Sequence, residues 1–94
     1  MLDPKLEAQD RRGRDAQQVL EAPVFKEAFD SVRGACLETF AKDALDPEQL
    51  LRAWLVYRLF LKLEGYINKA VREGADAKKL LDAMDKANQV NGQG

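Results

Sequence analysis

The chain has 94 residues, of which 46% are hydrophobic and 33% charged, and its fifteen basic and sixteen acidic side chains leave a formal net charge of −1. This size allows one domain with a thin core, and the apolar content is too high for intrinsic disorder. A nucleic-acid binder concentrates a basic excess on one face, so the balanced charge disfavours nucleic acid as a partner.

The residue types needed for catalysis are scarce. The chain has no histidine, which removes the commonest general base and metal ligand. Its carboxylates are dispersed, without paired or metal-loop spacing, and its glycines form no phosphate loop. We therefore predict no catalytic residue, no cofactor and no metal, and hence a protein that is not an enzyme. The single cysteine, Cys36, and the lack of a secretory signal lead us to expect a reducing cytoplasm.

The first predicted helix covers residues 4–21. Asp3 stands at the N-cap and Pro4 at the first helical position, where a missing N–H costs nothing. The helix is mostly polar and is weakened by Gly13.

This helix carries the chain's one basic cluster, Arg11, Arg12 and Arg14. The cluster could bind phosphate, RNA or an acidic protein surface. Asp10 and Asp15 bracket it, however, which favours a solvated face with local ion pairs. The basic patch is thus the weaker of our two candidate sites.

The second predicted helix runs from Pro23 to about Lys42, after a break at Ala22 imposed by the proline. Its apolar residues step by three or four along one face. They are Phe25, Phe29, Val32, Cys36 and Phe40. Cys36 has no histidine to activate it, so we expect it to be a small buried core residue.

The third predicted helix starts with Asp46 as N-cap and Pro47 at the first position, supported by a capping-box Gln49 and a Leu45–Leu50 staple. We expect it to end near Glu73, with Gly74 as the stop residue. A fourth helix would then cover residues 75–87, and residues 88–94 would be frayed.

Charged residues occupy one narrow face of the third helix, which excludes a membrane span. They are Arg58, Lys62, Lys69 and Glu73. A broad apolar arc lies opposite, about twice as wide as a surface helix needs. We assign the arc to the core, covered by the second helix on one flank and by the fourth on the other. It includes Leu50, Ala53, Trp54, Val56, Tyr57, Phe60, Leu61, Leu63 and Ile67.

Three large apolar residues, Leu51, Leu55 and Tyr66, lie on or beside the charged face, with Leu59 at its edge. One interpretation is that the first helix covers them. A second is that they form a contact surface for another copy or a partner, and a third is that they are single exposed apolar residues without a function. Our candidate interaction surface is therefore Leu51, Leu55, Arg58 and Tyr66.

A family resemblance starts at residues 23–30, PVFKEAFD, and continues with Trp54-Leu55, Gly65 and the Glu73-Gly74 pair. Over roughly residues 19–81 the chain resembles small all-helical accessory proteins encoded by tailed bacteriophages and prophages. The resemblance implies a role beside head-assembly and packaging components and supplies no catalytic residue. The chain departs from the pattern at residues 35–37 and Phe40, where bulkier aromatic residues are usual.

These observations predict an all-α fold, a small helical bundle with a long third helix antiparallel to the second. The fourth helix and a looser first helix would pack on it. We expect a polar N-terminal helix or arm over 1–22, a helical core domain over 23–88 and a flexible tail over 89–94. The expected function is non-catalytic protein–protein interaction through helix–helix contacts, with another copy, a phage structural protein or a host protein as partner. The resemblance implies a phage-encoded accessory or virion-associated component in the bacterial host cytoplasm. An inhibitor of a host or defence protein and a packaging-related DNA binder are the alternatives.

Overall fold

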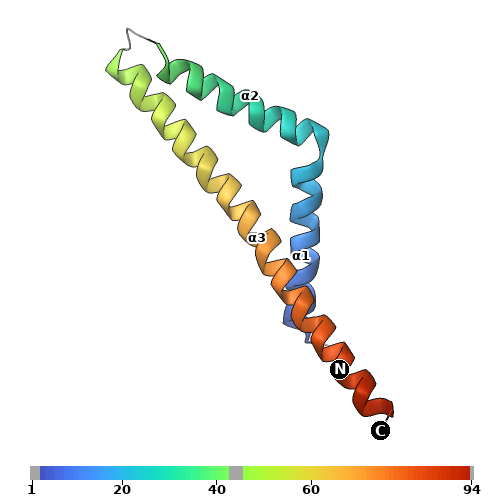
Figure 1. Cartoon of the computed structure of the whole chain (residues 1–94). Helices are drawn as coiled ribbons and strands as arrows, with labels where there is room; N and C mark the ends of the chain where they lie inside the picture. The colour runs from blue at the N-terminus through green and yellow to red at the C-terminus, as the bar shows by residue number, and fades with distance from the viewer. Residues whose placement is uncertain (1–2, 43–45, 94) are drawn as a thin grey trace. The chain divides into compact units, whose positions relative to one another are not determined.

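A computed structural model describes residues 3–42 and 46–93, with side chains up to residue 89. It contains three helices, α1 (Pro4–Glu21), α2 (Pro23–Phe40) and α3 (Pro47–Gln93), and no strand among the described residues (Figure 1). The predicted all-α class is confirmed. The predicted Leu45 staple lies outside the described residues.

Local capping explains where the helices begin. The backbone N–H of Lys5 donates to Asp3 Oδ1 at 2.9 Å, and that of Glu48 donates to Asp46 Oδ1 at 3.3 Å. These bonds confirm both predicted N-caps, because a capping carboxylate accepts from the free N–H groups of the first turn. Ala22 is extended, with ψ of 126°, as the residue before a proline prefers.

Helix α3 is continuous over 47 residues, so the predicted stop at Gly74 and the separate fourth helix are wrong. Among the described residues no glycine has a positive φ, the conformation that a glycine stop needs. Residues 75–87 are rich in alanine, lysine and leucine, which favour a helix. They belong to the same continuous helix as residues 47–74 and form no separate element.

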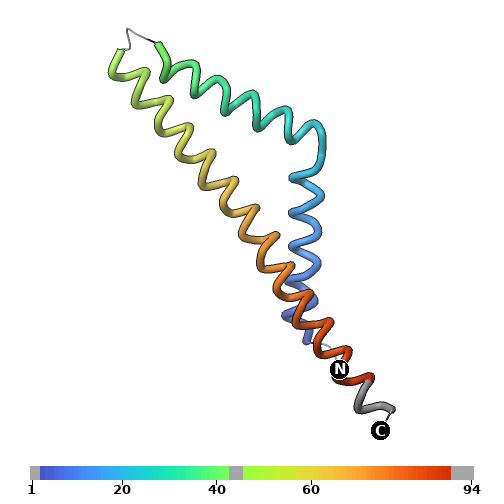
Figure 2. Tube along the Cα trace, in the orientation of Figure 1, coloured from blue at the N-terminus to red at the C-terminus, as the bar shows by residue number. Residues whose placement is uncertain are grey.

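The chain divides into two compact units. Residues 1–19 and 67–94 form one, which we call the α1 unit, and residues 20–66 form the other, which we call the hairpin unit. Helix α3, which the tube in Figure 2 follows as one helix, contributes residues 47–66 to the hairpin unit and residues 67–93 to the α1 unit. Each unit takes residues from the segment 23–88, and the expected division into 1–22, 23–88 and 89–94 stays a prediction.

In the α1 unit, α1 meets α3 backbone to backbone at two buried glycines. A Cβ placed on Gly13 would lie 2.6 Å from the Cα of Gly74, and one placed on Gly74 would lie 2.5 Å from the Cα of Gly13. Ala70 and Ala77 are buried on the same stretch of α3. Gly74 is therefore a residue of close helix approach. The need for space at this contact explains why a glycine stands in a segment whose other residues favour a helix.

In the hairpin unit, α2 and the first part of α3 run antiparallel. The ring centroids of Phe29 and Phe60 lie 4.5 Å apart, and those of Phe40 and Tyr57 lie 5.8 Å apart. Later residues of α2 thus meet earlier residues of α3. This is the arrangement that a short connection between two helices produces.

Candidate interaction surface

The seam between the two helices of the hairpin unit is mainly aromatic. Phe60 is buried against Phe29, and the guanidinium of Arg33 lies 5.6 Å from the centroid of the Phe60 ring. Arg33 Nη2 also donates to Glu64 Oε2 at 2.6 Å. Cys36 is buried, as predicted.

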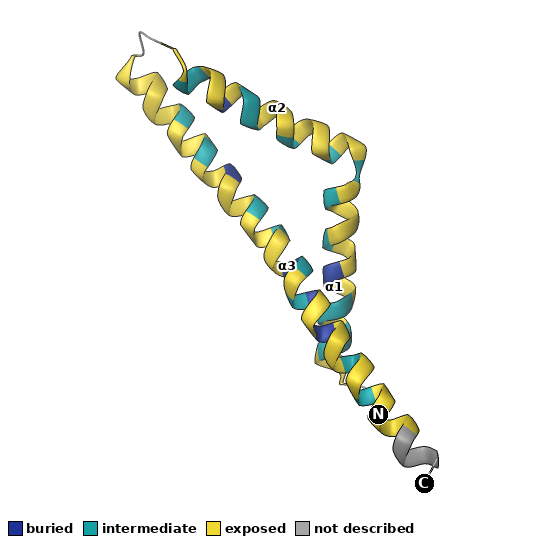
Figure 3. Ribbon diagram, viewed as in Figure 1, coloured by how far each residue is buried: buried dark blue, intermediate teal, exposed yellow. Residues whose placement is uncertain are grey.

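Outside this seam, most of the arc that we assigned to the core is exposed (Figure 3). The core assignment of five of its residues is wrong, because the expected covering helix is part of α3 itself. These five are Leu50, Trp54, Val56, Leu61 and Leu63, which are 42–52% exposed.

The exposed large apolar residues are unevenly distributed. Of the fourteen among the described residues, only Val19 and Leu80 belong to the α1 unit. The other twelve belong to the hairpin unit, on both of its helices. They are Val24, Val32, Leu37, Leu50, Leu51, Trp54, Leu55, Val56, Leu59, Leu61, Leu63 and Tyr66. The hairpin unit thus carries far more apolar surface than two helices can bury between themselves.

The two sides of the hairpin differ in polarity. In an antiparallel pair, positions displaced from the seam in the same rotational sense face the same side, at about 100° per residue. Arg33 and Glu64 are displaced from the seam in the same sense, so both face one side of the hairpin, where they form their ion pair. Lys26 and Asp30 line a depression together with this pair, so that side is charged over the first half of α2.

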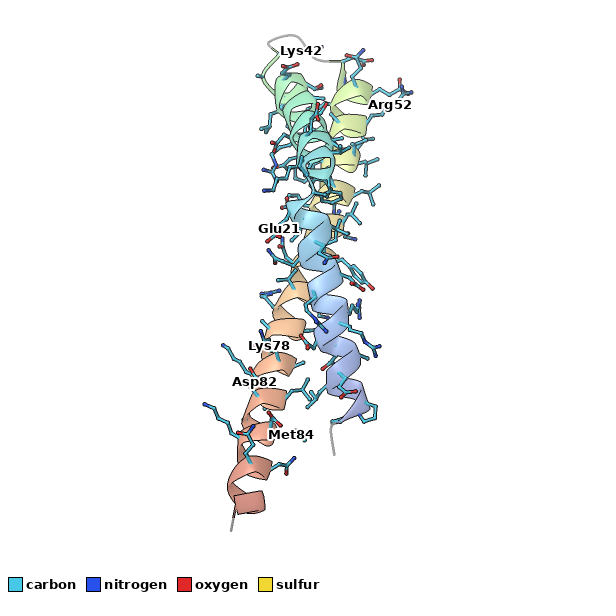
Figure 4. The ribbon with its side chains drawn as sticks, turned by 90° about the vertical axis from the view of Figure 1, so that its right-hand side faces the viewer. Glu21, Lys42, Arg52, Lys78, Asp82 and Met84 are labelled. Carbon is cyan, nitrogen blue, oxygen red and sulfur yellow. The ribbon has the colours of Figure 1, made fainter. Side chains whose placement is uncertain are left out.

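The opposite side has no charged residue in its middle, and we call it the apolar face. On α3 its residues follow a three–four–three spacing, which is the spacing of a helix–helix seam. Beyond one end of this row Arg52 points away from α2 (Figure 4), with its Nη2 3.1 Å from Glu48 Oε1. The face consists of Val24, Ala28, Val32 and Ala35 on α2, and of Val56, Leu59, Leu63 and Tyr66 on α3.

All four residues of the predicted interaction surface are exposed, but they do not form one patch. Tyr66 belongs to the apolar face, whereas Leu51, Leu55 and Arg58 lie on the outer back of α3. Leu51 also lines an apolar depression of about 540 Å³. Its other lining residues are Phe40, Pro47, Leu50 and Trp54.

Sequence reasoning missed Val56 and Leu63, because it placed them in the core. The three–four–three spacing of Val56, Leu59, Leu63 and Tyr66 could have identified them as a second seam. What the pattern could not say is whether another segment of the chain covers that seam.

The basic cluster lies on the exposed surface of α1. Arg14 Nε is 3.7 Å from Asp10 Oδ1, and Glu7 and Asp10 line the same shallow depression as Arg11 and Arg14. Carboxylates therefore alternate with the cations, as the sequence indicates. A surface of mixed charge attracts phosphate less than a basic stripe does.

Two properties of the described part of the chain bear on other kinds of site. Within residues 3–42 and 46–93, no three His, Cys, Asp or Glu residues are grouped so that they could hold a metal ion. No helix, over the same residues, is long and apolar enough to cross a membrane.

Comparison with known proteins adds no relative. No protein-family model, no curated protein and no solved structure matches the chain. The resemblance to phage-encoded accessory proteins therefore stays a prediction. What defines this chain is an all-helical fold whose two-helix hairpin exposes a large apolar surface.

Proposed function

We propose that the protein is a non-catalytic interaction module that binds another protein by helix–helix contact through its hairpin unit. The observation that carries the proposal is the placement of twelve exposed large apolar residues on residues 20–66. Monomeric proteins rarely expose contiguous apolar patches beyond a few hundred Å², and larger ones mark interaction sites. The lack of histidine and the dispersed carboxylates support a non-catalytic role.

The proposed biological setting is a tailed phage or prophage, in which the protein acts as an accessory or virion-associated component in the host cytoplasm. This part rests on the resemblance of residues 23–30, Trp54-Leu55 and Gly65 to such proteins.

Affinity capture tests the proposal. The tagged chain is used to recover proteins from bacterial cells with and without phage proteins, in parallel with Leu55→Asp and Leu80→Asp. Leu55 and Leu80 are 49% and 54% exposed, so they are matched in exposure but lie in different units. A buried carboxylate without a partner is costly, so we expect Leu55→Asp to lose the partner and Leu80→Asp to keep it.

Three results would separate the readings. Recovery of virion proteins supports the proposed role, and recovery of a host protein alone supports the inhibitor alternative. Equal recovery by the wild type and Leu55→Asp would contradict a role for the hairpin unit.

A further inference from the structure

Resting on the proposed function, we propose that the apolar face of the hairpin unit binds the apolar face of a second copy of this chain. The two hairpins would form an antiparallel four-helix arrangement, in which α3 of each copy lies over α2 of the other. The inference depends on the area of the face, its lack of charge and the charges along its two edges.

The area of the apolar face is sufficient for a stable dimer. Its six large side chains are 39–77% exposed, which leaves roughly 600 Å² of apolar surface per copy. Two copies would bury roughly 1,200 Å², at the lower end of the range of specific interfaces. On α2 the apolar face also contains the small residues Ala28 and Ala35, which leave room for the side chains of a facing helix.

The charge distribution selects this side of the hairpin. The opposite side holds the Arg33–Glu64 ion pair and the nearby Lys26 and Asp30, which would have to be desolvated in an interface. The apolar face imposes no such cost, because its eight residues are uncharged. Burial of this side by an equally apolar surface is therefore favoured.

The outer edges of the hairpin carry opposite charges. Glu27 and Glu38 lie on the outer edge of α2, and Lys62 lies on the outer edge of α3. All three are exposed, and the structure gives none of them an ion pair among the described residues. A second copy is thus complementary when its α3 lies along α2 of the first.

A two-fold axis parallel to the helices produces this arrangement and keeps the two copies in the same register. The contact of Phe29 with Phe60 places Glu27 level with Lys62 of either copy. Each copy's Glu27 then faces the partner's Lys62 at the rim of the interface. Neighbouring helices are antiparallel throughout, which also suits their dipoles.

Sedimentation equilibrium of the full chain tests the inference. We expect the wild type to have twice the 10.6 kDa of the chain. Leu59→Asp should weaken self-association at least about 100-fold, because it places a carboxylate in the middle of the apolar face. Leu80→Asp, at similar exposure in the α1 unit, should remain a dimer.

A charge exchange tests the orientation without touching the apolar residues. Lys62→Glu and Glu27→Lys should each weaken the dimer about 3- to 10-fold, because each places like charges at both rims. An equimolar mixture should recover the wild-type affinity, because the heterodimer has opposite charges at both rims.

Two outcomes would overturn the inference. A wild type that is monomeric at about 100 µM, well above the Kd of a stable dimer, excludes the second copy as occupant. Absence of recovery in the mixture excludes the stated orientation. If the wild type is monomeric while Leu55→Asp still abolishes capture of another protein, only this inference fails and the proposed function stands.

Discussion

The close approach of α1 and α3 at Gly13 and Gly74 makes a direct prediction about alanine substitutions. In the interior of a helix, replacing glycine by alanine stabilises the helix by about 1 kcal/mol. At Gly74 the added Cβ would lie 2.5 Å from the Cα of Gly13 and 3.0 Å from the carbonyl oxygen of Gln9. Both atoms belong to the backbone, so no flexible side chain can move aside.

The expected magnitude combines two opposing effects. Overpacking of a close contact costs about 1–3 kcal/mol, and a backbone contact lies toward the upper end of that range. After the gain in helix propensity, Gly74→Ala should lower the free energy of unfolding by about 1–2 kcal/mol. Gly13→Ala should act in the same direction, since its Cβ would lie 2.6 Å from the Cα of Gly74.

Two other helical glycines serve as matched controls. No atom beyond its own helix backbone lies within 4 Å of a Cβ placed on Gly34 or Gly65. Only the propensity effect acts there, so Gly34→Ala and Gly65→Ala should stabilise the protein by about 0.5–1 kcal/mol. The same chemical change is thus expected to have opposite signs at the two pairs of sites.

Thermal unfolding followed by far-UV circular dichroism measures these effects. For a chain of this length, 1 kcal/mol changes Tm by about 4–8 °C, so Gly74→Ala should lower Tm by at least about 4 °C. All variants are compared at one protein concentration, because self-association would shift Tm by mass action. A Gly74→Ala variant with a Tm raised like that of Gly65→Ala would refute the close approach.

Three further predictions concern the hairpin unit and the continuity of α3. Phe60→Ala should lower the free energy of unfolding in urea by about 3–5 kcal/mol, because Phe60 is the one buried aromatic residue of the described core. The control Leu80→Ala should cost under about 1 kcal/mol, because Leu80 is exposed. A double-mutant cycle with Arg33→Met and Glu64→Gln should give a coupling of about 0.5–1 kcal/mol, as expected for a partly exposed ion pair, and zero coupling would contradict the 2.6 Å contact. In hydrogen exchange, the amides of residues 72–77 should be protected throughout, since α3 is continuous there, and rapid exchange confined to Gly74 and Ala75 would contradict that continuity.

The sequence alone determined the features that depend on neighbouring residues. The helix starts at Pro4, Pro23 and Pro47 follow from a proline and the residue before it, and the structure places all three as predicted. The burial of Cys36 follows from its position in the apolar stripe of α2. These features need no knowledge of the rest of the chain, because capping bonds and helical periodicity act within one or two turns.

Tertiary structure alone decided what Gly74 does. A glycine after a long amphipathic run is an equally good helix stop or close-contact residue by local criteria. The contact with Gly13, on another helix, makes it the latter. The continuity of α3 at Gly74 also accounts for the exposure of Val56 and Leu63, because the fourth helix expected to cover them is part of α3. Periodicity reveals that a side chain is apolar, but which surface covers it depends on where distant segments of the chain lie.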